Sequence, residues 1–165
     1  GDLTRQDVDA IVNAANRSLL GGGGVDGAIH AAAGPELLAE CTELRRTMLK
    51  DGLPTGDCVA TGAGRLPCRY VLHTVGPIHH QHRDGGIQLL RSSHRRCLEE
   101  AERLGLRSVA FPAISCGAYG WDPVDAAPIA IQSVRAHPAA SVELVRFVLA
   151  NDRAYEAFAA AAGSD

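Results

Sequence analysis

Basic charge and long apolar runs are both scarce in this sequence, and each scarcity excludes a class of protein. The chain has 165 residues with a formal net charge of −3, and Lys50 is its only lysine. That charge argues against a broad nucleic-acid-binding surface, which is normally basic. No apolar run reaches the roughly 18 residues of a membrane span, and no secretory signal is recognisable. We therefore expect a soluble, cytoplasmic protein that contacts no membrane.

Paired cysteines are absent as well. No two of the five cysteines form a C-x-x-C pair, and their number is odd: Cys41, Cys58, Cys68, Cys97 and Cys116. This pattern indicates reduced thiols rather than a disulfide framework. His79, His80 and His82 lie in a polar stretch without a cysteine or carboxylate framework, so they favour a loop over a metal site. No metal site is therefore predicted.

Hydrophobic residues are abundant, by contrast, and their spacing predicts alternating strands and helices. They make up 46% of the chain, enough for the ordinary core of one domain. Strands are predicted at residues 10–12, 58–61, 70–75, 108–111 and 142–149, and helices at 25–33, 35–51, 87–104, 123–134 and 153–162. The strand runs are apolar on both faces, which is typical of a largely parallel sheet covered by helices on both sides. Three of the helices have predicted core faces. These are Leu37, Cys41, Leu44 and Met48 in the second helix, Ile87, Leu90, Leu98, Ala101 and Leu104 in the third, and Val124, Ala127, Ile131 and Val134 in the fourth.

Ligands of such α/β folds bind beyond the carboxyl ends of the strands, where we expect loops at residues 13–27 and 113–120. The first loop contains four consecutive glycines, residues 21–24, directly before a predicted helix. Bare glycines let several N–H groups converge on one anion, and the helix N-terminus adds partial positive charge. Because apolar residues and a helix flank the glycines, the motif favours a phosphate cradle over a flexible surface loop.

Two better-known phosphate motifs fit this loop poorly. A P-loop is excluded because Lys50 is far from any glycine loop. The spacing of Gly22, Gly24 and Gly27 satisfies G-x-G-x-x-G, but residues 13–21 separate these glycines from the preceding strand. A dinucleotide fingerprint should follow its strand immediately, so a dinucleotide-dependent oxidoreductase ranks low.

Polar side chains around the glycines allow both a structural and a functional interpretation. Asp26 could be a helix-capping carboxylate, worth about 1 kcal/mol, or could orient water beside a bound ligand. His30 lies on the same helix face, although a lone helical histidine is usually a packed or surface residue. The amides of Asn13 and Asn16 are explained equally well by turn chemistry and by recognition of sugar hydroxyls.

The second loop follows a predicted strand and precedes a helix, so it could offer a further set of N–H groups to a diphosphate. Within it, Tyr119 fits either packing on a sugar ring or a place at the rim of the core. Cys116 could be a nucleophile with His73 as its base. Nothing in the sequence fixes that geometry, and buried cysteines are usually inert.

Five blocks of the chain resemble the signature blocks of macrodomains and are most similar to those of the MacroD-type ADP-ribosyl hydrolases. The blocks are residues 1–4, 9–16, 20–34, 73–77 and 114–120, and the match extends from Gly1 to about Phe158. The resemblance implies a three-layer α/β/α fold with a mixed, largely parallel sheet and a cleft for ADP-ribose. It implies one macrodomain over residues 1–165, with edge strands that family members carry before Gly1 missing here.

The same resemblance implies that the chain hydrolyses ADP-ribose esters without a metal or cofactor. The substrates would be mono-ADP-ribose on Asp or Glu side chains of proteins and O-acetyl-ADP-ribose. Asp26 would position the attacking water, Asn16 would contact the distal ribose and His30 would support the site. The other expected ligand-binding residues are Asp2 and Leu3 at the adenine, Gly22, Gly23, Gly24 and Val25 on the first diphosphate loop, Ser115, Cys116, Gly117, Ala118 and Tyr119 on the second, and Asn13.

The resemblance leaves some alternatives open. A non-catalytic module that reads ADP-ribose is the alternative function, although such a reader needs no set of Asp26, Asn16 and His30. The expected partners are ADP-ribose and ADP-ribosylated proteins, with ADP-ribosylated nucleic acid left open, and we expect a monomer. Cys116 stands where threonine is common, and residues 61–69 are shorter than the class suggests. The residue that stacks on the adenine, near 149–151, is unassigned.

Overall fold

The computed structural model describes residues 1–81 and 85–163. Its central sheet contains β1 (Ala10–Ala14), β2 (Cys58–Gly62), β3 (Tyr70–Thr74), β4 (Ser108–Phe111) and β5 (Leu144–Phe147). The helices are α1 (Gly24–Ala33), α2 (Pro35–Arg46), α3 (Gly85–Arg103), α4 (Pro123–Arg135) and α5 (Asp152–Ala162), with short 3₁₀ turns η1 (Leu3–Arg5) and η2 (His79–Gln81). In the part of the chain that the structure describes, no helix is both long and apolar enough to cross a membrane.

The sheet has the strand order β2-β3-β1-β4-β5. Strand β1 is parallel to both β3 and β4, and β4 is parallel to β5, whereas β2 is antiparallel to β3. The predicted mixed, largely parallel α/β sheet is therefore confirmed. The register pairs Asn13 of β1 with His73 of β3, so these two side chains lie next to each other on one face of the sheet.

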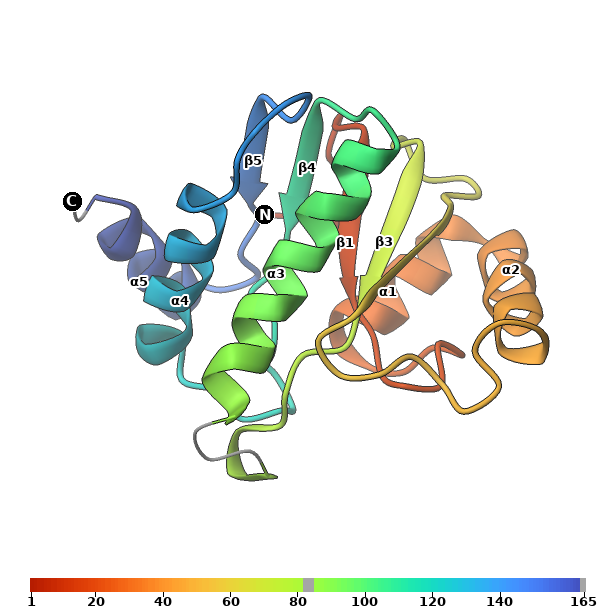
Figure 1. Cartoon of the computed structure of the whole chain (residues 1–165), viewed down its shortest axis with the longest axis horizontal. Helices are drawn as coiled ribbons and strands as arrows, with labels where there is room; N and C mark the ends of the chain where they lie inside the picture. The colour runs from red at the N-terminus through yellow and green to blue at the C-terminus, as the bar shows by residue number, and fades with distance from the viewer. Residues whose placement is uncertain (82–84, 164–165) are drawn as a thin grey trace.

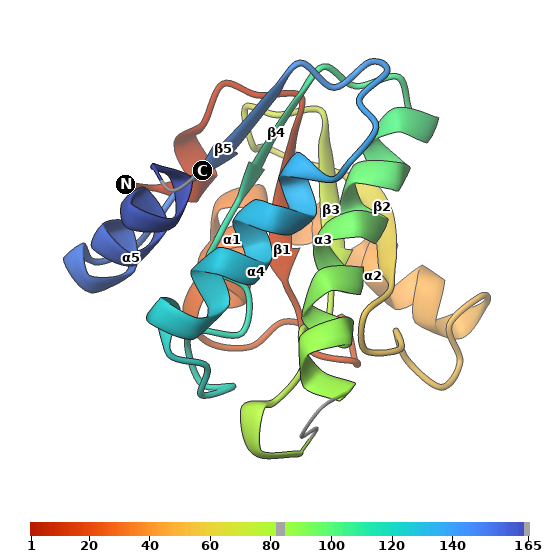
Figure 2. The same cartoon turned by 60° about the vertical axis from the view of Figure 1, so that its left-hand side comes forward.

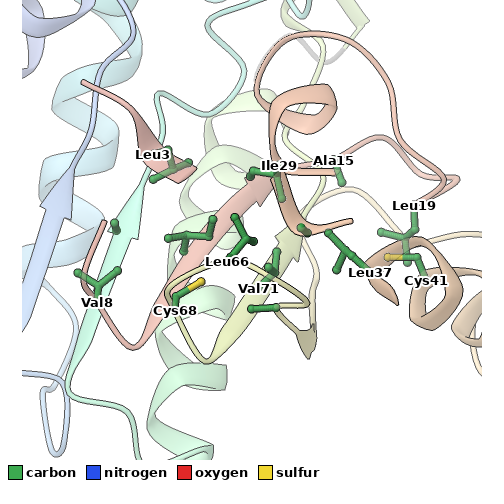
Figure 3. Packing of buried hydrophobic residues seen from close by; sticks show 14 of the residues in the cluster. Leu3, Val8, Ala15, Leu19, Ile29, Leu37, Cys41, Leu66, Cys68 and Val71 are labelled. Atoms are coloured by element: carbon green, nitrogen blue, oxygen red, sulfur yellow. The ribbon is translucent and has the colours of Figure 1, made fainter. Parts of the chain in front are cut away.

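Helices cover both faces of this sheet (Figure 1), which gives the predicted three layers. On one face Ile11 and Val71 belong to one hydrophobic cluster with Ile29 of α1 and Leu37 of α2. Figure 3 shows Val71, Ile29 and Leu37 in this cluster. On the other face, Val12 and Leu72 are buried beneath α3 with Leu90. Turning the molecule shows α4 beside α3 on this second face, with α5 outside α4 (Figure 2).

The element boundaries differ from the prediction in several places. Helix α2 ends at Arg46, so Met48 lies outside it and is 75% exposed. The chain turns there because the Arg45 guanidinium donates to the backbone carbonyls of Leu49 and Ser18. In α4 the predicted core residue Val124 is 60% exposed, since it stands in the first turn. The residues of α4 that are buried are Ala126, Ala127, Ala130 and Ile131.

Three further predicted boundaries are corrected. Asn13 and Ala14 belong to β1 rather than to the first loop, because Asn13 continues the ladder with His73. Strand β5 is shorter than residues 142–149 and pairs with β4 only over Leu144–Phe147. The predicted polar loop at 79–86 contains η2 and the start of α3. His82 of the histidine cluster lies outside the described residues.

Candidate functional site

A cleft of about 800 Å³ opens where the chain leaves the carboxyl ends of β1, β3, β4 and β5. One wall is the glycine loop and the first turn of α1, and the other is the loop at residues 113–119. Because parallel strands end at the same edge of the sheet, segments far apart in the sequence meet here. The sequence-predicted residues that line the cleft are Asp2, Leu3, Asn16, Gly22, Gly23, Gly24, Val25, Asp26, Ser115, Cys116, Gly117, Ala118 and Tyr119.

The glycine loop is folded tightly against the start of α1. A Cβ added to Gly27 would lie 2.5 Å from the carbonyl oxygen of Gly22, so only glycine allows this contact. Gly24 has φ +57° and begins the helix, while Gly23 caps it without a side-chain hydrogen bond. In the described structure the first-turn N–H groups of Gly24, Val25 and Asp26 have no backbone acceptor and are available to an anion.

The second loop passes directly over the segment that follows β3. A Cβ on Gly76 would lie 2.2 Å from Ser115 Oγ, so the two segments touch without room for a side chain. Ser115 itself has φ +67° and its backbone oxygen accepts from Trp121 N, which closes the loop. The Cys116 N–H donates to the Ala113 carbonyl oxygen and is therefore occupied within the loop.

Free donors of the second loop are the backbone N–H groups of Gly117, Ala118 and Tyr119, none of which donates to another described residue. They face the cleft from the side opposite the first turn of α1. Two sets of N–H groups on opposite walls suit an extended anion with two charged groups, such as a diphosphate. Tyr119 is the one aromatic side chain among the described residues that line the cleft.

Asp26 lies at the meeting point of the glycine loop and the sheet and is 4% exposed. Its Oδ1 accepts a hydrogen bond from Asn13 Nδ2 at 2.9 Å and is 3.5 Å from His30 Nε2. Its Oδ2 accepts no hydrogen bond from the described residues and is turned toward Gly22, where an added Cβ would lie 3.2 Å away. One carboxylate oxygen is thus held by the protein, and the other is available on the cleft side.

Asn16 stands beside this free oxygen and is held by its own loop. Its Nδ2 donates to the Gly21 carbonyl oxygen at 3.1 Å, and its Oδ1 accepts from Ser18 N and Ser18 Oγ. A Cβ on Gly22 would lie 3.3 Å from Asn16 Nδ2 as well as close to Asp26, so the glycine separates the two polar groups. The amide is therefore fixed in orientation before any ligand arrives.

Two predicted site residues do not line the cleft. Asn13 is fully buried in the sheet, so it cannot touch a ligand as expected; its amide contacts Asp26 and His73 instead. His30 packs behind Asp26 with its ring near Gly21 and has no place on the cleft wall. Sequence patterns could not distinguish Asn13 from Asn16, because burial in a strand depends on the neighbouring strands.

The hypothetical Cys116–His73 pair is not present. His73 contacts Asn13, Thr61 and Cys41, whereas the Cys116 thiol lies against the Ile114 carbonyl oxygen. Burial, followed by the negative charge of Asp122, raises the pKa of Cys116 to about 12, so its thiolate is scarce at neutral pH. The described part of the molecule also contains no cluster of three or more His, Cys, Asp or Glu side chains suited to a metal ion.

The far end of the cleft is formed by the N-terminal segment and the chain after β5. The Asp2 carboxylate accepts from Thr4 Oγ1 and Thr4 N, and these hydrogen bonds hold its pKa below the ordinary value. Leu3 is buried beneath it. Several lining residues were not predicted, namely Ala14, Ala15, Gly76, Pro112, Val148, Ala150 and Asn151. Their sequence signal is a position at or just after the end of a strand. Ala14, Ala15 and Gly76 also lie in signature blocks, and Ala150 and Asn151 fall in the region of the unassigned adenine-stacking residue.

Comparisons with known proteins agree with this architecture. A family model of the macro domain matches residues 12–130. A macro domain-containing protein of Streptomyces coelicolor is 58% identical over 163 residues, which cover 99% of this chain and 95% of that protein. A protein of Escherichia fergusonii named O-acetyl-ADP-ribose deacetylase is 52% identical over 134 residues, covering 81% of this chain and 75% of that protein. The solved macrodomain of Oceanobacillus iheyensis with ADP matches with a TM-score of 0.94 at 46% identity, covering 98% of this chain and 86% of that chain.

Proposed function

Because the chain belongs to the macro domain family, we propose that it binds ADP-ribose in the cleft and hydrolyses ADP-ribose esters there. The substrates are mono-ADP-ribose on Asp or Glu side chains of proteins and O-acetyl-ADP-ribose. The similar proteins support both halves of this proposal, since one structure contains ADP and one relative is named a deacetylase of O-acetyl-ADP-ribose. The proposed reaction uses water and involves no metal or cofactor.

The two sets of free N–H groups are the basis for placing the diphosphate. The first turn of α1 offers Gly24 and Val25, and the opposite loop offers Gly117 and Ala118. Backbone donors hold a phosphate without a cationic side chain, which explains how a chain of net charge −3 would bind an anion. With the diphosphate between these walls, the adenine points toward Asp2 and the distal ribose toward Asp26.

The Asp26 carboxylate would then act on water. Its Oδ2, free on the cleft side, accepts a proton from a water molecule as that water attacks the ester carbonyl carbon. The bond between the acyl carbon and the ribose oxygen breaks, and the ribose oxygen takes the proton from Asp26, which restores both the ribose hydroxyl and the Asp26 carboxylate. The released acid loses its own proton to solvent and leaves as a carboxylate. Asn16 is positioned to hold that ribose, and His30 supports the carboxylate from behind.

The single observation that carries this proposal is that the two oxygens of the Asp26 carboxylate have different surroundings. Oδ1 is held by Asn13, whereas Oδ2 faces the cleft between the two loops. A carboxylate that served only as a helix cap would accept hydrogen bonds from the first-turn N–H groups. Here no first-turn N–H of the described α1 donates to it, which favours a catalytic role over a structural one.

The decisive experiment measures release of ADP-ribose from an Asp/Glu-modified protein and of acetate from O-acetyl-ADP-ribose. We expect the double variant Asp26→Ala, Asn16→Ala to bind ADP-ribose but to lose about a hundredfold or more in kcat. The matched control Asp51→Ala removes an exposed carboxylate that does not line the cleft and should retain full activity. Full activity of the double variant would contradict the assigned roles. Tight ADP-ribose binding without hydrolysis of any ester by the unmodified chain would establish a reader instead.

A further inference from the structure

A chain of buried polar side chains runs from the interior of the sheet to the Asp26 carboxylate. We call it the buried relay; its members are Thr61 on β2, His73 on β3, Asn13 on β1 and Asp26 on α1. Thr61 Oγ1 lies 2.9 Å from His73 Nε2, and His73 Nδ1 lies 3.2 Å from Asn13 Nδ2, which is 2.9 Å from Asp26 Oδ1. His73 and Asn13 are completely buried, so neither can contact a ligand directly.

The donor and the acceptor of each hydrogen bond in the buried relay can be assigned by starting from Thr61. Thr61 Oγ1 donates to the Gly62 carbonyl oxygen at 2.9 Å, so it can only accept from His73 Nε2. The neutral imidazole therefore carries its proton on Nε2 and presents a lone pair at Nδ1. That acceptor faces the amide of Asn13 and selects its NH₂ group, which donates its second proton to Asp26 Oδ1.

The opposite orientation of the Asn13 amide would work against the Asp26 carboxylate. Its carbonyl oxygen would then face Asp26 Oδ1, and two acceptors at that distance repel unless the carboxylate takes up a proton. In the observed orientation Asn13 Oδ1 is buried and has no hydrogen-bond partner among the described residues. The amide thus leaves an acceptor unsatisfied while directing both donors to His73 and Asp26.

The surroundings of His73 keep its ring neutral. Burial, reinforced by the positive charge of His30 when protonated, lowers the pKa of His73 to about 3. The other ionisable groups that face the relay are Cys41 of α2, whose sulfur lies 3.9 Å from His73 Nε2, and Tyr119 of the second loop, whose pKa is raised by burial and by Asp26. Cys41 is closed off within the core on the α2 side of the sheet (Figure 3).

From these contacts we propose that His73 is a positioning residue for Asp26. It fixes the direction of the Asn13 amide, and through that amide it holds Asp26 with Oδ2 turned to the cleft. Thr61 acts one step further away by fixing which ring nitrogen of His73 carries the proton. This proposal rests on the proposed role of Asp26 in hydrolysis and names two residues that no ligand touches.

One test compares His73 with His94, a second histidine that is buried in the described core. His94 is 1% exposed, stacks on Phe111 and bonds to the Leu90 carbonyl oxygen, but it contacts no member of the relay. We expect His73→Leu to lower kcat for an ADP-ribose ester about tenfold and to leave the Kd for ADP-ribose nearly unchanged. His94→Leu should leave both kcat and Kd unchanged.

A conservative replacement separates positioning from simple loss of packing. His73→Asn retains an acceptor near the place of Nδ1 and should recover part of the lost kcat. At the far end, Thr61→Val keeps the shape but loses the hydroxyl, and we expect kcat to fall about threefold, whereas Thr61→Ser should match the unmodified chain. Equal losses in His73→Leu and His94→Leu, or equal kcat in Thr61→Val and Thr61→Ser, would overturn the proposal.

A last measurement is independent of activity. Nitrogen-15 spectra of the imidazole at pH 7 should show the His73 proton on Nε2, and this should persist in Asp26→Asn because the direction is set from Gly62. A proton on Nδ1 would overturn the positioning role even if the chain is an efficient hydrolase. A proton on Nε2 in a chain that hydrolyses no ADP-ribose ester would contradict the proposed function and still support the direction of the relay.

Discussion

Gly22 and Gly27 approach so closely that a Cβ on Gly27 would lie 2.5 Å from the Gly22 carbonyl oxygen. The contact holds the glycine loop down on the first turn of α1 and so leaves the N–H groups of that turn pointing into the cleft. The requirement for glycine at position 27 therefore comes from the backbone of another residue and not from its own dihedral angles. This relationship gives a direct test of how the anion cradle is built.

We expect Gly27→Ala to push the glycine loop away from α1. The clash is with backbone, which cannot rotate aside, so unfolding free energy should fall by about 2 kcal/mol and ADP-ribose affinity should drop. Gly23→Ala is the matched control for folding, because a Cβ there meets no atom within 4 Å. Urea unfolding and calorimetric titration measure the two effects. Equal stability of both variants would show that the loop does not need this contact.

Gly76 should matter for the second wall of the cleft. A Cβ at this position would lie 2.2 Å from Ser115 Oγ and 2.6 Å from Ile114 Cγ2, so Gly76→Ala must displace the loop that offers the opposing N–H groups. We expect ADP-ribose affinity to fall at least about tenfold, with a smaller effect on thermal unfolding than that of Gly27→Ala. Gly117→Ala, where an added Cβ meets nothing, is the comparison for stability. Unchanged affinity in Gly76→Ala would contradict the role given to this loop.

Outside the cleft, we expect Glu102 to be the carboxylate whose replacement lowers the unfolding free energy most. Its oxygens accept from Ser141 Oγ and from the N–H groups of Ala140, Ser141 and Val142, and His137 Nε2 is 3.0 Å away. Burial would raise its pKa, but these donors outweigh burial and lower it. Glu102→Gln replaces an acceptor by a donor and should lower the unfolding free energy by about 2–3 kcal/mol.

The control for that variant is Glu100→Gln on the same helix, which loses only the surface pair with Arg103 and should change stability by less than about 0.5 kcal/mol. Because the pKa of Glu102 is depressed in the folded chain, its contribution is complete above pH 4.5 and is lost as the pH falls below that value. Chemical unfolding at pH 7 and at pH 4 measures both effects. Similar losses in Glu100→Gln and Glu102→Gln would refute the assignment.

Acid should destabilise the fold before most carboxylates titrate. Burial lowers the pKa of His73 to about 3 and that of His94 to about 4, from an ordinary value of 6.5. Below pH 6.5 the unfolded chain binds protons that the folded chain cannot, so each histidine lowers the unfolding free energy by about 1.4 kcal/mol per pH unit. That loss continues until the pH reaches the pKa of the folded state.

Removing His94 tests this dependence without touching the cleft. Its Nε2 is buried with no partner among the described residues, and its Nδ1 bonds to the carbonyl of Leu90 one helical turn earlier. His94→Leu should therefore reduce the slope of unfolding free energy against pH between 6.5 and 4 by the contribution of one bound proton, about 1.4 kcal/mol per pH unit. Urea unfolding at half-unit pH steps is the measurement, and an unchanged slope would show that another group binds the proton.

The sequence predicted much of the fold because its signals are local. Apolar runs, helix-starting prolines and stopping glycines identified every strand and helix of the described sheet and its two covering layers. The errors arose where a tertiary contact decided the boundary. Arg45 ends α2 by binding carbonyls outside the helix, and Met48 is exposed as a result.

The prediction of the candidate site shows the same contrast between local sequence signals and tertiary contacts. The residues of both loops were predicted because glycines, a helix start and a strand end are visible in one dimension, and the structure brings them to one cleft. Asn13 and Asn16 looked alike in the sequence, since both are amides beside the same loop. Only the pairing of β1 with β3 showed that Asn13 is buried against His73, whereas Asn16 reaches the cleft.

The amino-acid sequence by itself therefore determined the order of elements, the anion cradle and the carboxylate beside it. These depend on backbone freedom and on residues that are neighbours in the chain. The tertiary structure decided which oxygen of Asp26 is held and which is free, and it brought Thr61, His73 and Asn13 into one line behind it. Hydrogen-bond direction across three strands depends on their register, and no pattern within a single segment encodes that register.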